Sequence, residues 1–294
     1  MAITAGDVKK LREMTGAGMM DCKKALSETN GNLEEAVDFL RKKGLAAAQK
    51  KQSRVAAEGA VITLVEGTRG VILEVNCETD FVSKGDDFQN FAKEMANYVL
   101  TSKPASIEAL REAKQEAVNE LTLKCGEKID LRRFEVIEGN GLLGAYNHGG
   151  RIGVLVELST DTNNDTTQEV VKDLAMHVAA ANPMFLKSDD IDEDYKKRES
   201  DIYAAQLKEE GKPEDMIPKI VQGKINKLAS EVCLLEQKFV KDPDLKINKW
   251  LAGKSKDAGT DLGVTTFKKL ILGEGIEKKE DNLADEVAKM TQGN

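Results

Sequence analysis

Apolar residues near the N-terminus recur at three- and four-residue intervals, which predicts short helices with one buried face each. Thr4 can cap the first helix, with Asp7 three residues later as its reciprocal partner. The sequence Thr-Gly-Ala-Gly at 15–18 ends this helix, and a second one is expected over 19–28. Two short helices joined by a glycine-rich turn are therefore expected.

A third helix is expected to start after Asn32, an effective N-cap residue. The residues expected to face inward are Leu33, Val37 and Leu40. The stretch 43–54 is rich in Ala, Lys and Gln and is expected to form a solvated helical linker. Residues 1–54 therefore read as a small three-helix module, similar to ubiquitin-associated modules, followed by its linker.

Beyond residue 55 the pattern changes to alternating or fully apolar runs, which predict strands. Four such runs occupy residues 60–65, 70–75, 142–146 and 152–158. The segment Glu-Gly-Thr-Arg at 66–69 joins the first two as a hairpin. Two further strand-like runs follow at 234–240 and 265–272.

Two of these strands belong to an internal repeat. Gly-Val-Ile-Leu-Glu-Val at 70–75 matches Gly-Val-Leu-Val-Glu-Leu at 153–158, an offset of 83 positions. The helices that follow match at an offset of 79, because Gln89, Lys93, Ala96, Val99 and Pro104 correspond to Gln168, Lys172, Ala175, Val178 and Pro183. Two related α/β units therefore lie in tandem.

The two offsets differ because the first unit has four extra residues between its strand and its helix. That segment contains Thr79, Asp80, Phe81 and Val82. A repeat preserves what its scaffold needs, so extra residues in one copy are a candidate functional segment. Taken alone, Asp80 is expected to be a helix cap, and the alternative to a functional role for Phe81 is a core aromatic at the end of a loop.

Residues 191–231 return to a helical pattern interrupted by Gly211-Lys212-Pro213. This pattern predicts an antiparallel helical hairpin with arms roughly 27 Å long, at a rise of 1.5 Å per residue. The hairpin can either pack on the core or project as an arm for self-association, and the sequence leaves both open. A short amphipathic helix is expected near the C-terminus, with Leu283, Val287 and Met290 on one face.

The expected fold class is therefore α+β, with two α/β subdomains, an N-terminal helical module and an inserted helical hairpin. The first core subdomain is expected over 55–140 and the second over 141–186 and 232–273. Residues 187–231 form the expected hairpin, and 274–294 a C-terminal module.

The net charge of −8 argues against direct binding to nucleic acid, which depends on clustered Lys and Arg. Residues 1–54 nevertheless hold 11 basic and 7 acidic side chains, a balance of +4 that leaves −12 for the remainder. A basic module before an acidic body favours a protein partner with an acidic surface.

Four cysteines, with no Cys-x-x-Cys pair, predict neither a disulfide framework nor a zinc site and favour a reducing compartment. No cofactor is expected. The N-terminal sequence has no apolar export segment, and no apolar run reaches the ~20 residues that a membrane span needs. The chain is therefore expected in the cytoplasm, without a membrane partner.

The glycine-rich turn at 15–18 opens a helix, but it is not a phosphate-binding loop. No strand precedes it, and no Gly-Lys-Ser/Thr closes it. Met19 and Met20 at the start of the helix provide a soft apolar surface suited to docking on another protein. The alternative for one of the two is a place in the module's own core.

Three motifs resemble the elongation factor Ts family: residues 15–26 (TGAGMMDCKKAL), 79–82 (TDFV) and 148–156 (HGGRIGVLV). The resemblance covers essentially the whole chain in the same order. It implies that the region of Met19, Met20 and Lys23 docks on the nucleotide-binding domain of elongation factor Tu. It also implies that Asp80 and Phe81 enter that partner near its magnesium and phosphate site.

The resemblance implies three further contacts. His148 and the second core unit would touch another domain of elongation factor Tu, and the C-terminal helix with Leu283 and Val287 would brace the first. The hairpin would serve dimerisation, although monomer, dimer and a two-plus-two complex all stay open. The implied activity is release of GDP, with no catalytic residue and no metal ligand in this chain.

Two other classes of protein, an enzyme and an adaptor, are alternatives to an exchange factor. An enzyme would need a catalytic constellation, and the two histidines, His148 and His177, lie in different repeat units with no hydrolase or metalloprotease motif around them. His177 lies on an apolar helix and is expected to be a satisfied core residue. An adaptor with a ubiquitin-associated-type module is compatible with residues 1–54, but it does not predict the extra Asp80-Phe81 segment.

Overall fold

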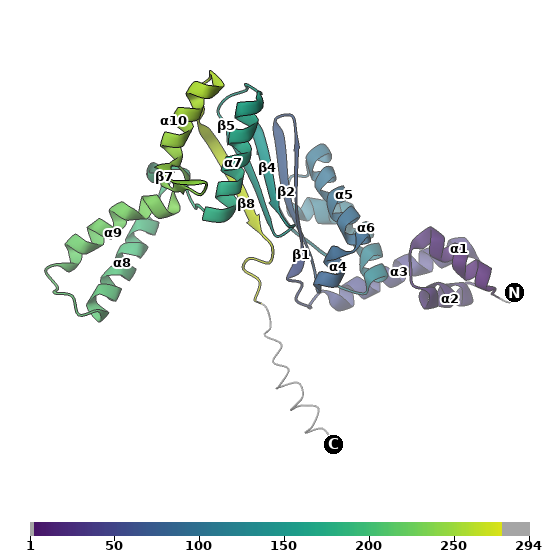
Figure 1. Cartoon of the computed structure of the whole chain (residues 1–294). Coiled ribbons are helices and arrows are strands. Elements are labelled where there is room, and N and C mark those ends of the chain that lie inside the picture. The colour runs from purple at the N-terminus through teal and green to yellow at the C-terminus, as the bar shows by residue number, and fades with distance from the viewer. Residues whose placement is uncertain (1–2, 278–294) are drawn as a thin grey trace.

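A computed structural model describes residues 3–277 of the chain. Within these residues ten α-helices and eight strands form a mixed α+β structure. The molecule is elongated: helices α1 and α2 lie at one end, and the hairpin of α8 and α9 lies at the other, as Figure 1 shows. None of the described helices is long and apolar enough to cross a membrane.

The N-terminal module contains the three expected helices, α1 (Ala5–Thr15), α2 (Met19–Glu28) and α3 (Leu33–Lys51). Thr4 and Asp7 form the expected reciprocal capping box of α1. The side chain of Asn32 accepts hydrogen bonds from the backbone N–H groups of Glu34 and Glu35 in the first turn of α3. A small core holds the helices together, built from Leu11, Ala17, Cys22, Ala25, Leu26, Ala36 and Leu40.

Helix α3 differs from the expectation in one respect. It runs without a break to Lys51, and its second half is not fully solvated, because Gly44 is buried against helix α6 (Ile107–Cys125). A Cβ atom at Gly44 would lie 3.2 Å from the carbonyl oxygen of Asn119 on α6. The small residue thus permits close packing between α3 and the core.

The first sheet consists of β1 (Glu58–Glu66), β2 (Arg69–Cys77) and β3 (Asp130–Glu138) in the order β1-β2-β3, all antiparallel. Helix α5 (Asp86–Ser102) packs on β1 and β2, and α6 packs on β3. The first two strands and α5 were expected. Helix α6 and strand β3 were not assigned from the sequence.

The second sheet consists of β4 (Leu143–His148), β5 (Ile152–Leu158) and β8 (Val264–Ile271) in the order β4-β5-β8. Helix α7 (Asp165–Ala181) packs on β4 and β5. Helix α10 (Ile247–Ala258), which was not expected, packs on α7. Each sheet is thus covered on one side by helices.

The two sheets face each other through a small apolar layer, so the core has the order helix, sheet, sheet, helix (Figure 1). The two repeat glycines lie at this contact. A Cβ atom at Gly153 would come within 2.6 Å of Val61, and one at Gly70 within 3.0 Å of Leu155. The paired Gly-Val motifs therefore reflect close packing of one sheet on the other.

The repeat is also visible in the helices. Both α5 and α7 are 17 residues long, and their first residues, Asp86 and Asp165, are 79 positions apart. Both end on a non-glycine residue with positive φ, Lys103 at 51° and Asn182 at 49°. The units differ before these helices, where only the first contains the short helix α4 (Asp80–Lys84).

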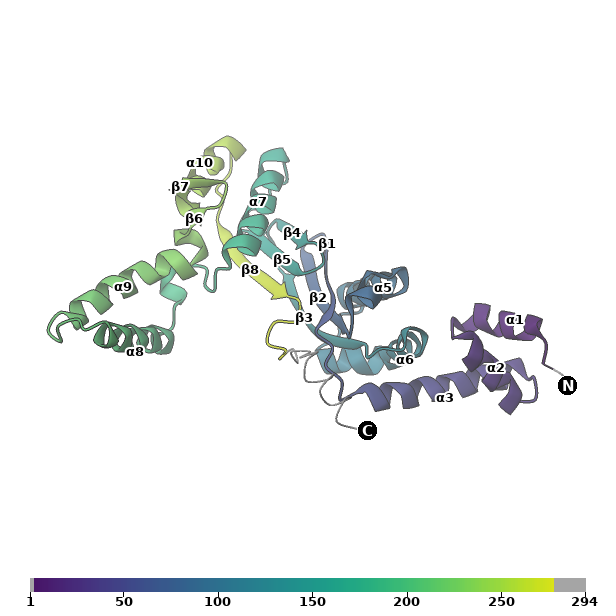
Figure 2. The same cartoon turned by 60° about the horizontal axis from the view of Figure 1, so that its bottom comes forward.

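The helical hairpin consists of α8 (Glu193–Glu209) and α9 (Ile217–Val232), preceded by a 3-10 turn at Ser188–Asp190. The two helices pack on each other and project away from both sheets, as Figures 1 and 2 show. The hairpin therefore projects from the core, which is one of the two arrangements that the sequence left open.

The segment expected as a strand over 234–240 is mostly not one. It starts as a 3-10 turn, Leu234–Glu236, and only Lys238–Phe239 (β6) pairs, with β7 (Asp242–Lys246). The apolar side chains of Leu234 and Phe239 instead fill the second core. The C-terminal helix expected around Leu283 and Val287 lies outside the described residues.

Candidate functional site

The extra segment of the first repeat unit forms helix α4 directly after strand β2. Its N-cap is Thr79, whose hydroxyl oxygen accepts a hydrogen bond from the Val82 N–H at 3.4 Å. The expected cap, Asp80, is instead the first helical residue. Its position places a negative charge at the positive end of the helix, where the dipole favours it.

The side chains of α4 differ in their exposure to solvent. Phe81 is 85% exposed, the highest value among the exposed large apolar residues of the described part of the chain. Val82 packs against the first core, and Ser83 is buried. The core role considered for Phe81 is therefore wrong, and the ring stands outside this protein's own interior.

Asp80 is paired within α4. Lys84 Nζ lies 2.6 Å from Asp80 Oδ2, one helical turn away. This hydrogen bond and the charge of Lys84 hold the pKa of the Asp80 carboxyl below its usual value. The turn therefore presents an ionised carboxylate beside an exposed ring at neutral pH.

Glu127 fixes the start of α4 from the loop between α6 and β3. Its Oε2 accepts the backbone N–H groups of Glu78 and Thr79 at 3.1 and 2.9 Å. Its Oε1 accepts the Thr79 hydroxyl at 2.6 Å. Sequence reasoning missed Glu127, and the only local signal is its position directly after Gly126, the residue that ends α6.

A second exposed surface lies on α1 and α2. Met19 and Met20 are 60% and 74% exposed, so neither has the core place that was the alternative for one of them. They line a groove of about 630 Å³ together with Ile3, Thr4, Ala5, Val8, Lys9, Arg12 and Lys23. The apolar floor with three cationic side chains suits a partner surface with apolar and acidic residues.

His148 ends strand β4 and is exposed. Its Nδ1 lies 3.0 Å from the Tyr146 hydroxyl. Figure 1 places α1 and α2 away from both sheets, at the far end of α3. Met19, Met20 and Lys23 on α2 therefore lie apart from the other predicted residues, which are residues 79–82 at α4 and His148 at the end of β4.

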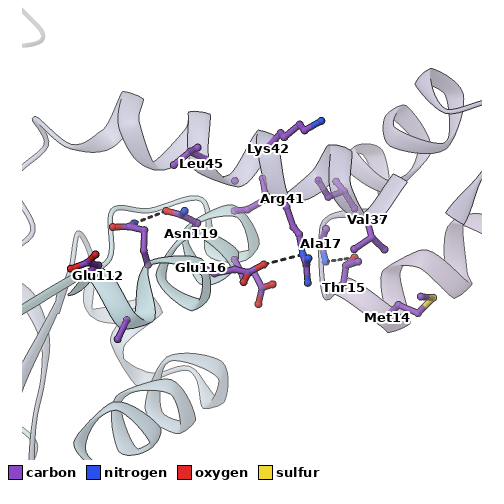
Figure 3. Close-up of a pocket in the computed structure, with 16 residues that line it drawn as sticks. Met14, Thr15, Ala17, Val37, Arg41, Lys42, Leu45, Glu112, Glu116 and Asn119 are labelled. Carbon is purple, nitrogen blue, oxygen red and sulfur yellow. Dashed lines mark hydrogen bonds and ion pairs between the residues drawn. The ribbon is translucent and has the colours of Figure 1, made fainter. Parts of the chain in front are cut away.

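A groove of about 650 Å³ lies between α3 and α6 (Figure 3). An ion pair between Arg41 and Glu116, with a distance of 3.0 Å, connects its two walls. Gln115 Nε2 donates to Asn119 Oδ1 at 2.9 Å on the α6 wall. The lining mixes both signs of charge, and the contacts connect the N-terminal module to the core.

The described residues contain no group of three or more His, Cys, Asp and Glu side chains arranged to hold a metal ion. His177 is fully buried and bonded to Gln237, so it has no access to a substrate. The polar groups of α4 serve to cap, pair and support a short helix with an exposed ring. The structure therefore belongs to the α+β class and presents an exposed aromatic ring on a capped short helix.

Comparisons with known proteins identify the family. The family model "Elongation factor TS" matches residues 78–274. The chain is 50% identical over 299 residues to an elongation factor Ts from Clostridium perfringens (strain SM101 / Type A), covering 98% of this chain and 99% of the relative. It is 49% identical over 298 residues to one from Clostridium novyi (strain NT), covering 97% of each.

A relative outside that genus is similar to the same extent. The elongation factor Ts of Syntrophotalea carbinolica is 48% identical over 304 residues, covering 99% of this chain and all of the relative. The chain belongs to the elongation factor Ts family.

Proposed function

We propose that this chain is a guanine-nucleotide exchange factor that releases GDP from elongation factor Tu during translation elongation. It is not an enzyme, because members of this family act by exchange and make no covalent bond. Family membership over nearly the whole chain supports the exchange function. The exposed ring of Phe81 on a braced turn supports the proposed mechanism.

The mechanism follows from how GTPases hold their nucleotide. Backbone N–H groups surround the phosphates, and a bound Mg²⁺ neutralises their charge. A rigid apolar side chain inserted beside this site displaces the elements that carry the magnesium ligands. In this proposal Phe81 is the wedge, and the ionised carboxylate of Asp80 competes for the metal's coordination.

The energy available from the wedge alone is limited. Burying one phenylalanine side chain in a partner is worth about 1.5–3 kcal/mol. A ten-thousand-fold increase in release needs about 5.5 kcal/mol of differential stabilisation. The remaining free energy must come from other contacts that form with the nucleotide-free partner.

The other exposed surfaces supply these contacts in the proposal. Met19, Met20 and Lys23 dock on the nucleotide-binding domain of elongation factor Tu, and His148 contacts another of its domains. The groove between α1 and α2 supports this assignment, since it combines exposed methionines with cationic side chains. A bracing role is proposed for Leu283 and Val287, which lie outside the described residues.

The same linkage returns the factor to its free form. A factor that weakens nucleotide affinity is itself weakened by nucleotide, and by the same ratio. GTP binding therefore expels the factor after GDP has left. This reciprocity allows one molecule of the factor to act on many copies of the partner.

We further propose a division of labour along the chain. Residues 1–54 dock, 55–140 carry the wedge, and 141–186 with 232–273 form the second contact unit. The projecting hairpin within 187–231 joins two copies of the chain, supported by the exposed side chain of Ile202 on α8. Residues 274–294 would form the C-terminal module.

The direct test is the release of fluorescent GDP from elongation factor Tu with increasing amounts of the purified chain. The wild type should accelerate release, and Phe81→Ala should lower the maximal rate about 10- to 100-fold, the factor that corresponds to the burial energy of the ring. Binding should stay within a few-fold. Met216→Ala, at an equally apolar but distant exposed residue, should behave as the wild type.

Unchanged release in Phe81→Ala would remove α4 from the mechanism. An adaptor with a ubiquitin-associated-type module, the remaining alternative, would bind without accelerating release at all.

A further inference from the structure

The backbone that leads into α4 lacks a neighbouring strand at its last two residues. Strand β2 ends at Cys77, and the N–H groups of Glu78 and Thr79 point to a side chain instead of a sheet partner. Both donate to Glu127, at 3.1 and 2.9 Å, and the Thr79 hydroxyl donates to the same carboxylate at 2.6 Å. One carboxylate thus receives three donors from two successive residues.

A reciprocal set of bonds strengthens this attachment. The Glu78 carboxylate accepts the backbone N–H of Lys128 at 2.7 Å and the Arg54 guanidinium at 3.2 Å. Lys128 Nζ in turn donates to the carbonyl oxygens of Gln52 and Arg54, at 2.9 and 3.0 Å. The start of α4 is therefore fixed both to the loop before β3 and to the end of α3.

Helix α4 needs such support. It has only five residues, and isolated helices of that length are not stable in water. Of its five residues only Ser83 is buried, and Val82 packs half-buried against the first core. Its C-terminal part is held by Gln89, whose side chain donates to the Ser83 carbonyl oxygen at 2.7 Å, and its start by the Thr79 hydroxyl, which both caps the helix and binds Glu127.

We propose that Glu127 is a positioning residue of the exchange reaction, which holds the Phe81 ring at the angle required to enter the partner. This inference rests on the proposed function of α4. Glu127 does not touch the partner; it acts through Thr79. A displacement of a positioned group by about 1 Å can lower a rate about 100-fold, so loss of this support should affect the rate strongly.

The alternative is that Glu127 only stabilises the fold. The two roles differ in their relation to Phe81. A positioning residue loses its effect once the ring it positions is removed, whereas a stabilising residue affects both backgrounds equally. They also differ in kinetics, since a misdirected wedge lowers the maximal rate and leaves docking through Met19 and Met20 intact.

The experiment measures release of fluorescent GDP from elongation factor Tu by Glu127→Ala, Phe81→Ala and the double variant. Glu127→Ala should lower the maximal rate about 10- to 100-fold and change the half-saturating concentration less than about three-fold. In the Phe81→Ala background the same change should lower the maximal rate by less than about two-fold. Glu127→Gln keeps an acceptor oxygen and should lie in between.

The matched control is Glu138→Ala, at the opposite end of β3, on the order of 30 Å away at the rise of an extended strand. The Glu138 carboxylate also has a partner, Lys103 at 2.6 Å, but it lies far from α4. The Glu138→Ala variant should release GDP from elongation factor Tu at the wild-type rate. Circular dichroism melts of all variants show whether each one folds, and Glu127→Gln replaces Glu127→Ala in the cycle if the alanine variant does not.

The outcomes separate the two proposals. If Phe81→Ala slows release but Glu127→Ala and Glu127→Gln do not, the positioning role is wrong and the exchange mechanism stands. If the Glu127 change lowers the maximal rate by the same factor in both backgrounds, the positioning role is also wrong, and Glu127 contributes only to general stability. If Phe81→Ala itself exchanges at the wild-type rate, the mechanism proposed for α4 is wrong, and the inference about Glu127 is overturned with it.

Discussion

Asp80 and Lys84 are joined across one turn of α4, with Lys84 Nζ 2.6 Å from Asp80 Oδ2. The lysine therefore already neutralises part of the charge that the mechanism assigns to Asp80. Because the pair is exposed, a metal or phosphate group of a partner can replace either member without a large desolvation cost. In the free protein the Asp80 carboxylate is thus ionised, and a partner can replace Lys84 as its contact.

This pair gives a first prediction. Asp80→Asn should slow GDP release several-fold, because it removes the charge that competes for Mg²⁺ coordination, while Thr79 still caps the helix. Lys84→Gln removes only the internal counter-charge and should not slow release. Titration of Mg²⁺ in the release assay checks both variants. Equal slowing by the two would mean that the ion pair itself, and not the free carboxylate, is what the reaction needs.

Much of the scaffold could be predicted because its signals are local. The caps at Thr4 and Asn32, the hairpin of β1 and β2, and the matched helices α5 and α7 all follow from residues close together in sequence. The repeat also marked the extra segment at 79–82, since the comparison needed only the two copies within this chain.

Strand β3 could not be predicted so simply, because Arg132 and Arg133 interrupt its apolar alternation. Both side chains bind Glu74, a fully buried residue of β2, at 2.8 and 2.6 Å. This distant partner balances their charges next to the core. Glu127 escaped notice for the same reason, since its three donors come from residues 48 and 49 positions earlier in the chain.

The groove on α1 and α2 gives a second prediction. Changing Met19 and Met20 together to serine should weaken binding to elongation factor Tu about 10- to 1000-fold, because each buried methionine is worth about 1.5–3 kcal/mol and such losses are seldom fully additive. Titration calorimetry measures the affinity. The melting temperature should not fall, since both side chains are exposed in the free protein.

A control for this change is available at the tip of the hairpin. Met216 is 51% exposed, and Met216→Ser should leave the affinity for elongation factor Tu unchanged. If the double change at Met19 and Met20 also leaves it unchanged, the groove is not a docking surface for this partner.

The hairpin gives a third prediction. If α8 and α9 join two copies, light scattering of the full chain should give twice the mass of 32.2 kDa. Ile202→Asp should then yield monomers, because it places a charge on a side chain that is 42% exposed in the single chain and buried in the proposed dimer. Exchange activity should persist, since the hairpin projects away from both sheets.

Two results would contradict this assignment. A mass of one chain at all concentrations would show that the hairpin does not join two copies. A dimer that survives both Ile202→Asp and replacement of residues 193–231 by a short Gly-Ser linker would place the interface elsewhere.

His177 on α7 is held in one neutral form by its neighbours. Gln237 uses its Nε2 to donate to the carbonyl oxygens of Ala181 and Glu231, so its Oε1 faces His177 Nε2, at 3.0 Å, and must accept. The backbone N–H of Val240 donates to His177 Nδ1 at 3.3 Å. A second proton on Nδ1 would face this N–H, donor against donor, so the contact disfavours the charged form of the buried ring.

Burial lowers the pKa of His177 below 6.5, against the smaller opposite effect of the hydrogen bond to Gln237. At pH values between this lowered pKa and 6.5 the unfolded chain therefore binds a proton that the folded chain does not. The free energy of unfolding should fall as the pH drops through that range, by at most about 1.4 kcal/mol per pH unit. Above pH 6.5 both states are neutral at this residue, and its contribution to the pH dependence should vanish.

Urea unfolding between pH 5.5 and 7.5 checks this prediction, because the chain has only two histidines. His177→Gln should be less stable at pH 7.5, having lost its buried hydrogen bonds, but should lose less further stability than the wild type as the pH falls. His148→Gln removes the exposed histidine and should retain the wild-type slope. If His177→Gln shows the wild-type slope as well, the pH dependence arises from carboxylates, and the buried ring does not contribute to it.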